Sequence, residues 1–278
     1  MYDRILIPTD GSPVAEAAVN AALKLAARFD AALHALYVRE TIQNVDETVG
    51  ADKSPTAAVR SKATDTDVEV TTAVRESTQP VHRELLDYAD DTDIDCIVMG
   101  THGRTGLHRY VLGSVTERTL RESTIPVMTV GEETVLNPAF ESILVPTDGS
   151  TVAVAAVNHG IELSLATDSA LHVVHVVETD IGWSDVSAGE ILSALELQGE
   201  QGLETVVRRA SKAGVSTVSA SVLSGTPYQA IVDYAEDRDV DCLVIGSHGR
   251  TGLNRYLLGS VTERVVRLTD VPVFVVKS

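Results

Sequence analysis

Residues 95–114 read "DCIVMGTHGRTGLHRYVLGS", and residues 241–260 read "DCLVIGSHGRTGLNRYLLGS". Each copy begins with a short apolar run, which is typical of a buried strand in a parallel sheet. A loop follows that carries glycines at fixed places, Gly100, Gly103 and Gly113 in the first copy. "SVTER" then reads as the start of a helix. The stretch therefore predicts a strand, a glycine loop and a helix N-terminus, twice in one chain.

The repeat extends over most of the chain. "ILIPTDGS" at residues 5–12 returns as "ILVPTDGS" at residues 143–150, and residues 93–118 return at 239–264 with twenty of twenty-six identical. A chain of 278 residues is also of the right length for two compact domains. We therefore expect two tandem domains, which we place, with their linker, at residues 1–131, 132–140 and 141–278.

The spacing between the repeated stretches grows from 138 to 146 residues, so eight residues have entered the second copy. We place them between Val177 and Val215, in and before the second helix of that copy. An irregular segment around Trp183 is followed there by a long helical stretch, expected from about Ile191 to Lys212. The insertion therefore predicts a longer second helix in the second domain.

Strands and helices alternate in each copy, which predicts a parallel sheet with helices on both faces. Ser12 and Pro13 are the N-cap and first residue of the first helix, since they are the residue types preferred there. Its apolar positions are Val14, Ala17, Ala18, Ala21 and Leu25. The strands expected in the first copy are Arg4–Pro8, Ala32–Val38, Val68–Val74, Cys96–Gly100 and Val127–Val130.

The composition excludes some partners. Forty acidic against twenty-two basic residues give a net charge of -18, which should repel nucleic acid and anionic lipid. No apolar stretch approaches the ~18 to 20 residues that span a bilayer, and the first residues lack a signal peptide. We therefore expect a cytoplasmic protein. Cys96 and Cys242 lie within apolar runs, which predicts buried, reduced thiols and no metal site.

The acidity has two interpretations, an ordinary acidic protein or one adapted to a cytoplasm rich in salt. In the second case, screening over a few ångström removes the repulsion between carboxylates. The melting temperature should then rise between low and molar KCl in a thermal unfolding experiment. A midpoint that does not rise would rule out the adaptation to salt.

The glycine loops follow strands whose carboxyl ends border the ligand crevice of open parallel sheets. Gly100, Gly103 and Gly113 can take positive φ and let backbone amides approach an anion closely. Arg104 or Arg109 could add hydrogen bonds to phosphate oxygens. Ser114 and Glu117 have the spacing of a capping box. The alternative is that the glycines only form turns and Ser114 only caps its helix.

The pattern G-x2-G-x9-G-[ST], which both copies contain, resembles the nucleotide-binding signature of the universal stress protein superfamily. "ILIPTDGS" is similar to that family's first strand and turn. The resemblance covers nearly the whole chain. It implies two Rossmann-like domains of the adenine nucleotide alpha hydrolase-like type, each with a five-stranded parallel sheet of order 3-2-1-4-5. It also implies that ATP or a related adenine nucleotide binds at the strand ends, with or without Mg²⁺.

The resemblance implies a binding site in each copy, with base and ribose near the first two strands and phosphates on the glycine loop. The first-copy residues are Pro8, Thr9, Asp10, Val38, Gly100, Gly103, Arg104, Gly113, Ser114 and Val115. The second-copy residues are Pro146, Thr147, Asp148, Val176, Gly246, Gly249, Arg250, Gly259, Ser260 and Val261.

Individual polar residues of these motifs have simpler roles open to them. Asp10 and Asp148 could cap a turn through the side chain. His102 and His248 could contact phosphate, or could simply be packed or solvated. The resemblance also implies pairing through the fifth strands, "PVMTV" and "PVFVV", either within one chain as a pseudo-dimer or between chains.

The sequence leaves three functions open. The first is an ATP-binding stress-response protein in which occupancy sets conformation or the choice of a protein partner, with little or no turnover. The second is an adenylating or ATP-hydrolysing enzyme of the same fold. The third is a structural assembly module. No catalytic residues are identified, because the sequence contains neither a Walker lysine nor a general base with an orienting group, although slow hydrolysis stays open.

Overall fold

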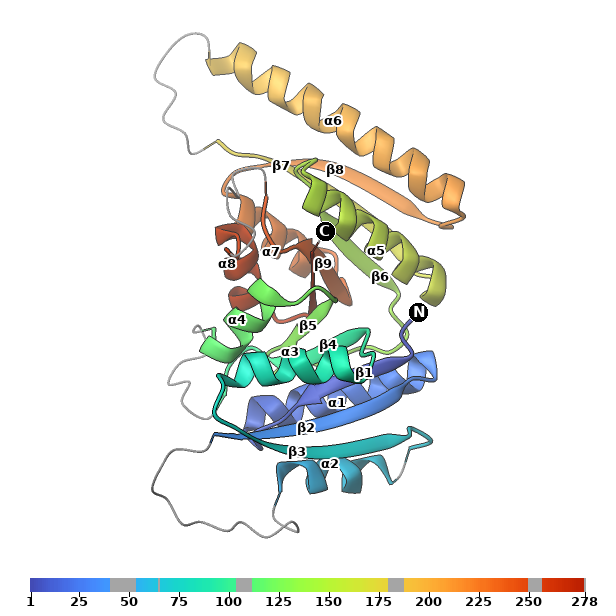
Figure 1. Ribbon diagram of the computed structural model, residues 1–278. Helices are drawn as coiled ribbons and strands as arrows, with labels where there is room; N and C mark the ends of the chain where they lie inside the picture. Colours follow the sequence, from blue (N-terminus) through green and yellow to red (C-terminus); the bar gives the residue numbers. More distant parts are fainter. Residues whose placement is uncertain (41–53, 65, 104–111, 180–187, 250–256, 278) are drawn as a thin grey trace. The chain divides into compact units, whose positions relative to one another are not determined.

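The computed structural model describes residues 1–40, 54–64, 66–103, 112–179, 188–249 and 257–277 (Figure 1). Its internal contacts divide the chain into two compact units, Met1–Pro138 and Ala139–Ser278. Each unit alternates strands and helices along its sequence, as the repeat predicts.

Among its described residues, the first unit contains five strands and four helices. They are β1 (Arg4–Pro8), α1 (Pro13–Phe29), β2 (Ala32–Glu40), α2 (Pro55–Ala63), β3 (Val70–Ser77), α3 (Val81–Asp91), β4 (Cys96–Gly100), α4 (Ser114–Glu122) and β5 (Val127–Val130).

The described part of the second unit also contains five strands and four helices. Its elements are β6 (Ser142–Pro146), α5 (Thr151–Thr167), β7 (Ala170–Val177), α6 (Ala188–Ala213), β8 (Val218–Ser224), α7 (Pro227–Asp237), β9 (Cys242–Gly246), α8 (Ser260–Leu268) and β10 (Val273–Val276).

The strands of each unit form a parallel sheet of the predicted order. In the first unit the order is β3-β2-β1-β4-β5, and in the second it is β8-β7-β6-β9-β10. In each sheet the strand order therefore reverses between the first and fourth strands of the unit, which pair directly and in parallel. The expectation of an α/β fold with two five-stranded parallel sheets is confirmed, and the reversal places a ligand crevice beyond the carboxyl ends of these two strands.

Helices cover the sheets as right-handed connections require. In the first unit α3 and α4 pack against each other, while Lys62 of α2 donates to Asn20 of α1 at 3.2 Å. In the second unit α7 and α8 pair likewise, and Arg209 of α6 donates to Asn158 of α5. Figure 1 shows α2 along β3 and α6 along β8. The first two and the last two helices of each unit thus belong to opposite faces.

The first helix begins where the sequence predicts. The Ser12 hydroxyl accepts a hydrogen bond from the amide of Ala15 at 3.3 Å, and Pro13 is the first helical residue. Of the predicted apolar positions, Val14, Ala18, Ala21 and Leu25 are buried and Ala17 is half-buried. The equivalent α5 is capped in the same way by Ser150.

Three of the five predicted strands in the first unit have the observed bounds, and two differ. β2 runs two residues further than Val38, and β3 covers Val70–Ser77 where Val68–Val74 was expected. The ladder between them pairs Leu33 with Val70 and continues to Glu40 with Ser77. Backbone pairing therefore carries both strands past the apolar residues on which the prediction rested. α6 also begins three residues before Ile191.

The two cysteines lie in the cores of their units. Cys96 and Cys242 are fully buried, free thiols, and burial raises the pKa of both well above the ordinary value. The prediction that both cysteines lie buried in the core is confirmed. In the described part of the chain, no helix is long and apolar enough to cross a membrane.

Candidate functional site

The "PTDG" turn at the end of the first strand is held by its own side chains. The Thr9 hydroxyl accepts from the amide of Gly11 at 3.3 Å, and Asp10 Oδ1 accepts from the amide of Ser12 at 3.0 Å. Gly11 has φ +75°, which favours glycine. Asp10 therefore caps a turn, and Asp148 does the same for the amide of Ser150 at 2.9 Å.

The three glycines of the first repeated loop are constrained by close approach. Positive φ, which the sequence leaves open to Gly100, Gly103 and Gly113, is found at none of them. A Cβ on each would instead come close to neighbouring atoms. A Cβ on Gly103 would stand 2.9 Å from Asp10 Oδ2, and one on Gly113 would stand 3.0 Å from the Cα of His102. Gly103 therefore lies directly against Asp10 of the "PTDG" turn, and a side chain there would displace the Asp10 carboxylate.

The same contacts recur in the second unit and are slightly tighter. A Cβ on Gly249 would stand 2.6 Å from Asp148 Oδ2, and one on Gly246 would stand 2.9 Å from a methyl carbon of Val152. The end of the fourth strand is also anchored to the following helix, because the Thr262 hydroxyl donates to the carbonyl of Gly246 at 2.7 Å. Thr116 makes the equivalent bond to Gly100 at 2.8 Å.

The helix after the loop begins without a capping box. The N-cap of α4 is Gly113, whose carbonyl accepts from the amide of Glu117 at 2.8 Å, and no side chain of the described residues caps this end. The expected capping role of Ser114 is therefore wrong, because glycine takes the extended N-cap conformation and Ser114 becomes the first helical residue. Gly259 and Ser260 repeat this arrangement at α8. The uncapped amides leave a positive helix end beside the glycine loop.

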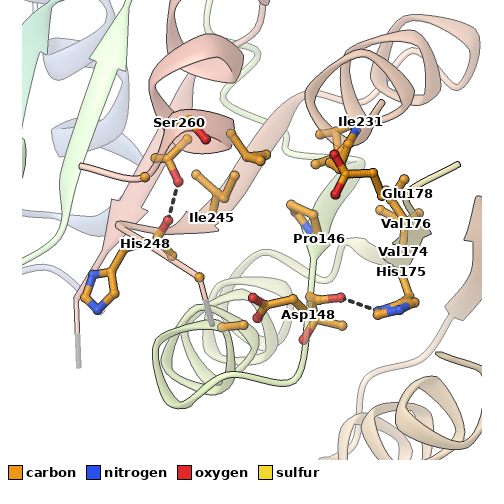
Figure 2. A pocket seen from close by; sticks show the side chains of 18 of the residues that line it. Pro146, Asp148, Val174, His175, Val176, Glu178, Ile231, Ile245, His248 and Ser260 are labelled. Atoms are coloured by element: carbon orange, nitrogen blue, oxygen red, sulfur yellow. Dashed lines mark hydrogen bonds between the residues drawn. The ribbon is translucent and has the colours of Figure 1, made fainter. Parts of the chain in front are cut away.

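A cavity of about 420 Å³ lies at the switch point of the second unit (Figure 2). Ser260 and His248 lie on one side of it in Figure 2, and His175, Glu178 and Ile231 on the other, with Pro146 and Asp148 between them. This volume is within the range of about 300–1,000 Å³ found for small-molecule sites. Further lining residues are Thr147, Ala153, Val174, Val176, Val177, Leu195, Pro227, Ile245, Gly246, Gly249, Gly259, Val261 and Thr262.

The predicted second-copy residues converge on this cavity. Its lining contains Pro146, Thr147, Asp148, Val176, Gly246, Gly249, Gly259, Ser260 and Val261. In the first unit, Pro8 and Gly100 likewise end β1 and β4, and Ser114 begins α4. Thr9 and Asp10 follow β1, Val38 is in β2, Gly103 and Gly113 flank the loop, and Val115 is in α4. Arg104, Arg109 and Arg250, as well as Trp183, are outside the described residues.

Sequence reasoning missed several of the residues that line the cavity. His175 and Glu178 come from β7 and the residue after it, Leu195 from α6, and Pro227 and Ile231 from α7. Only the place of His175 directly before Val176 in "LHVVHVV" indicated that these two side chains point to different faces of the strand. The others belong to helices whose packing against the pocket depends on the whole fold.

The two histidines of the cavity have defined partners. His175 Nδ1 is 2.8 Å from the carbonyl oxygen of Thr147, and His248 Nδ1 is 3.1 Å from the Ser247 hydroxyl. Asp148 and Glu178 are its carboxylates, and the described part of the lining contains no lysine or arginine. Within the described residues, no three His, Cys, Asp or Glu side chains are grouped to hold a metal ion. Among the described residues, backbone amides and the end of α8 are therefore the groups that could attract an anion.

Comparisons with known proteins agree with the motifs. The universal stress protein family model matches residues 1–131 and 139–277. Universal stress protein MJ0531 of Methanocaldococcus jannaschii is 36% identical over 141 residues, which is 50% of this chain and 82% of that protein.

Solved structures show the tandem fold over the whole chain. A universal stress protein from Archaeoglobus fulgidus has a TM-score of 0.69 at 23% identity, covering 99% of this chain and 96% of that one. A functionally unknown protein, PA1789 of Pseudomonas aeruginosa, has a TM-score of 0.70 at 17% identity, with coverage of 99% and 92%. With both halves matched by the family model, this chain belongs to the universal stress protein family.

Proposed function

We propose that each half of the protein binds ATP or a related adenine nucleotide, and that occupancy, with little turnover, sets which conformation meets a protein partner. The observation that carries the proposal is the convergence described above. Residues chosen from a sequence signature alone, far apart in the chain, line one cavity of about 420 Å³ at the switch point of the second sheet.

The phosphates would lie on the side of Ser260. There Gly249 has no side chain to separate its backbone amide from an anion, and its Cβ position is already taken by Asp148 Oδ2. The uncapped N-terminus of α8 adds its partial positive charge. Mg²⁺, when bound, would be carried chiefly by the phosphates, since this cation keeps several waters and few protein ligands.

Turnover is expected to be slow, because the described lining offers no clear catalytic group. Nδ1 of His175 is engaged by the carbonyl of Thr147, and Nδ1 of His248 contacts a serine hydroxyl that no carboxylate orients. Arg104 and Arg250 stay predictions as phosphate ligands. Pairing through β5 and β10, within one chain or between chains, also stays a prediction, and light scattering of the purified protein would test it.

The experiment that tests the function is isothermal titration of the protein with ATP and Mg²⁺, at low and at molar KCl. We expect saturable binding, with phosphate released far more slowly than nucleotide exchanges. Mass spectrometry of ligand released by heat would identify the nucleotide that co-purifies. Absence of binding in both salts would refute the proposal, and stoichiometric pyrophosphate release would favour the adenylating enzyme.

A further inference from the structure

The second pocket has a wall supplied by the helix that the insertion lengthened. α6 has 26 residues where α2 of the first unit has 9. Leu195, in the N-terminal half of α6, lines the cavity together with Val176 and Ile231. Leu197, only two residues away, is 55% exposed and is not part of the lining. The pocket face of α6 is therefore narrow.

A close contact fixes where α6 lies. A Cβ on Gly199, one helical turn after Leu195, would stand 2.5 Å from Cδ2 and 3.2 Å from Cγ of His175. The backbone of α6 thus rests directly on the imidazole ring. Gly202, on the same helix, has open space around its Cβ position, so close approach is particular to Gly199.

His175 also contacts the "PTDG" turn of residues 146–149. Nδ1 of His175 is 2.8 Å from the carbonyl oxygen of Thr147, and because a carbonyl only accepts, Nδ1 carries the proton in this bond. Thr147 immediately precedes Asp148 in the "PTDG" turn. A continuous set of contacts therefore runs from α6 through His175 to the turn. The equivalent position in the first unit is Tyr37, so this arrangement is not shared by both halves.

We propose that Leu195 forms the part of the second pocket against which the nucleobase packs, and that the contact between Gly199 and His175 holds Leu195 in that position. This inference rests on the proposed function and adds a specificity-determining residue to it. Leu195, Ile231 and Pro227 are apolar residues of the lining, which suit a nucleobase and not phosphate. Figure 2 shows Ile231 and Glu178 on the opposite side from Ser260, where the phosphates are proposed to lie.

The first test compares Leu195→Ala with its matched control, Leu197→Ala, by titration with ATP and with inorganic triphosphate. Removing the apolar contact should weaken ATP binding at one of the two sites by about five- to tenfold, and leave triphosphate binding unchanged. Leu197→Ala should bind both ligands as the unmodified protein does. Equal ATP affinity in Leu195→Ala would overturn the inference, as would equal weakening of ATP and triphosphate, which would indicate general damage to the pocket.

The second test displaces α6, which carries Leu195, without substituting a residue that lines the pocket. Gly199→Ala should also weaken ATP binding several-fold, because the added methyl group must push α6 away from His175, whereas Gly202→Ala should not. Unchanged ATP affinity in Gly199→Ala would contradict the role of this contact. The proposed function fails separately, if the unmodified protein binds no ATP at all.

Discussion

Gly249→Val is expected to abolish ATP binding at the second site, with a loss of at least about 100-fold in affinity, or about 3 kcal/mol. Its Cβ would stand 2.6 Å from Asp148 Oδ2, so the carboxylate must leave a position in which it also accepts from the amide of Ser150. The two methyl groups would then occupy space beside the amides proposed to hold phosphate. Titration calorimetry with ATP measures the effect.

The matched control is Gly202→Val, on the exposed face of α6, where a Cβ meets nothing within 4 Å. It should bind ATP normally. The circular dichroism of both variants should equal that of the unmodified protein, since Gly249 follows the end of β9 and the Cβ position of Gly202 is open. Gly103→Val should act in the same way on the first site, its Cβ being 2.9 Å from Asp10 Oδ2. Full affinity in either loop variant would refute the proposed role of the glycines.

His159 is expected to make the protein less stable in mild acid. It lies on α5 with only 8% of its surface exposed, its ring packs 5.7 Å from that of Phe274, and burial lowers its pKa from 6.5 to about 4. The unfolded chain binds a proton as the pH falls through 6.5, but the folded protein does not until about pH 4. Stability from this group is therefore present above pH 6.5 and lost between these values.

The expected loss from His159 between pH 7 and pH 5 is about 2 kcal/mol in the free energy of unfolding. Urea unfolding of the unmodified protein and of His159→Leu, at both pH values, measures it. The variant has no titrating group at this position, so its fall in stability should be smaller by that amount. His34, His82 and His172, whose pKa values burial also lowers, are present in both proteins and cancel in the comparison. Equal falls would show that His159 is protonated in the fold.

The helix of residues 13–29 illustrates how far local chemistry reaches. Ser12, Pro13 and the apolar spacing predict its first residue and its buried face, because capping and periodicity are properties of neighbouring residues. Strand β3 illustrates the limit. Its bounds come from its ladder with β2, and the sequence of β3 itself contains only a mixed pattern. The repeated loop falls between these cases. The sequence correctly predicts that it joins β4 to α4 and β9 to α8, but not that close approach constrains its glycines.

Sequence alone determined that this protein is a duplicated α/β fold with a glycine-rich loop at the switch point of each sheet. Repeats, apolar runs and helix starts depend on residues that are close together along the chain. Tertiary structure decided that Gly103 and Gly249 are needed because carboxylates from a distant turn approach them, and that Leu195 and His175 complete the second cavity. Such contacts join residues that only the packed sheet and helices bring within van der Waals distance, so no local pattern could encode them.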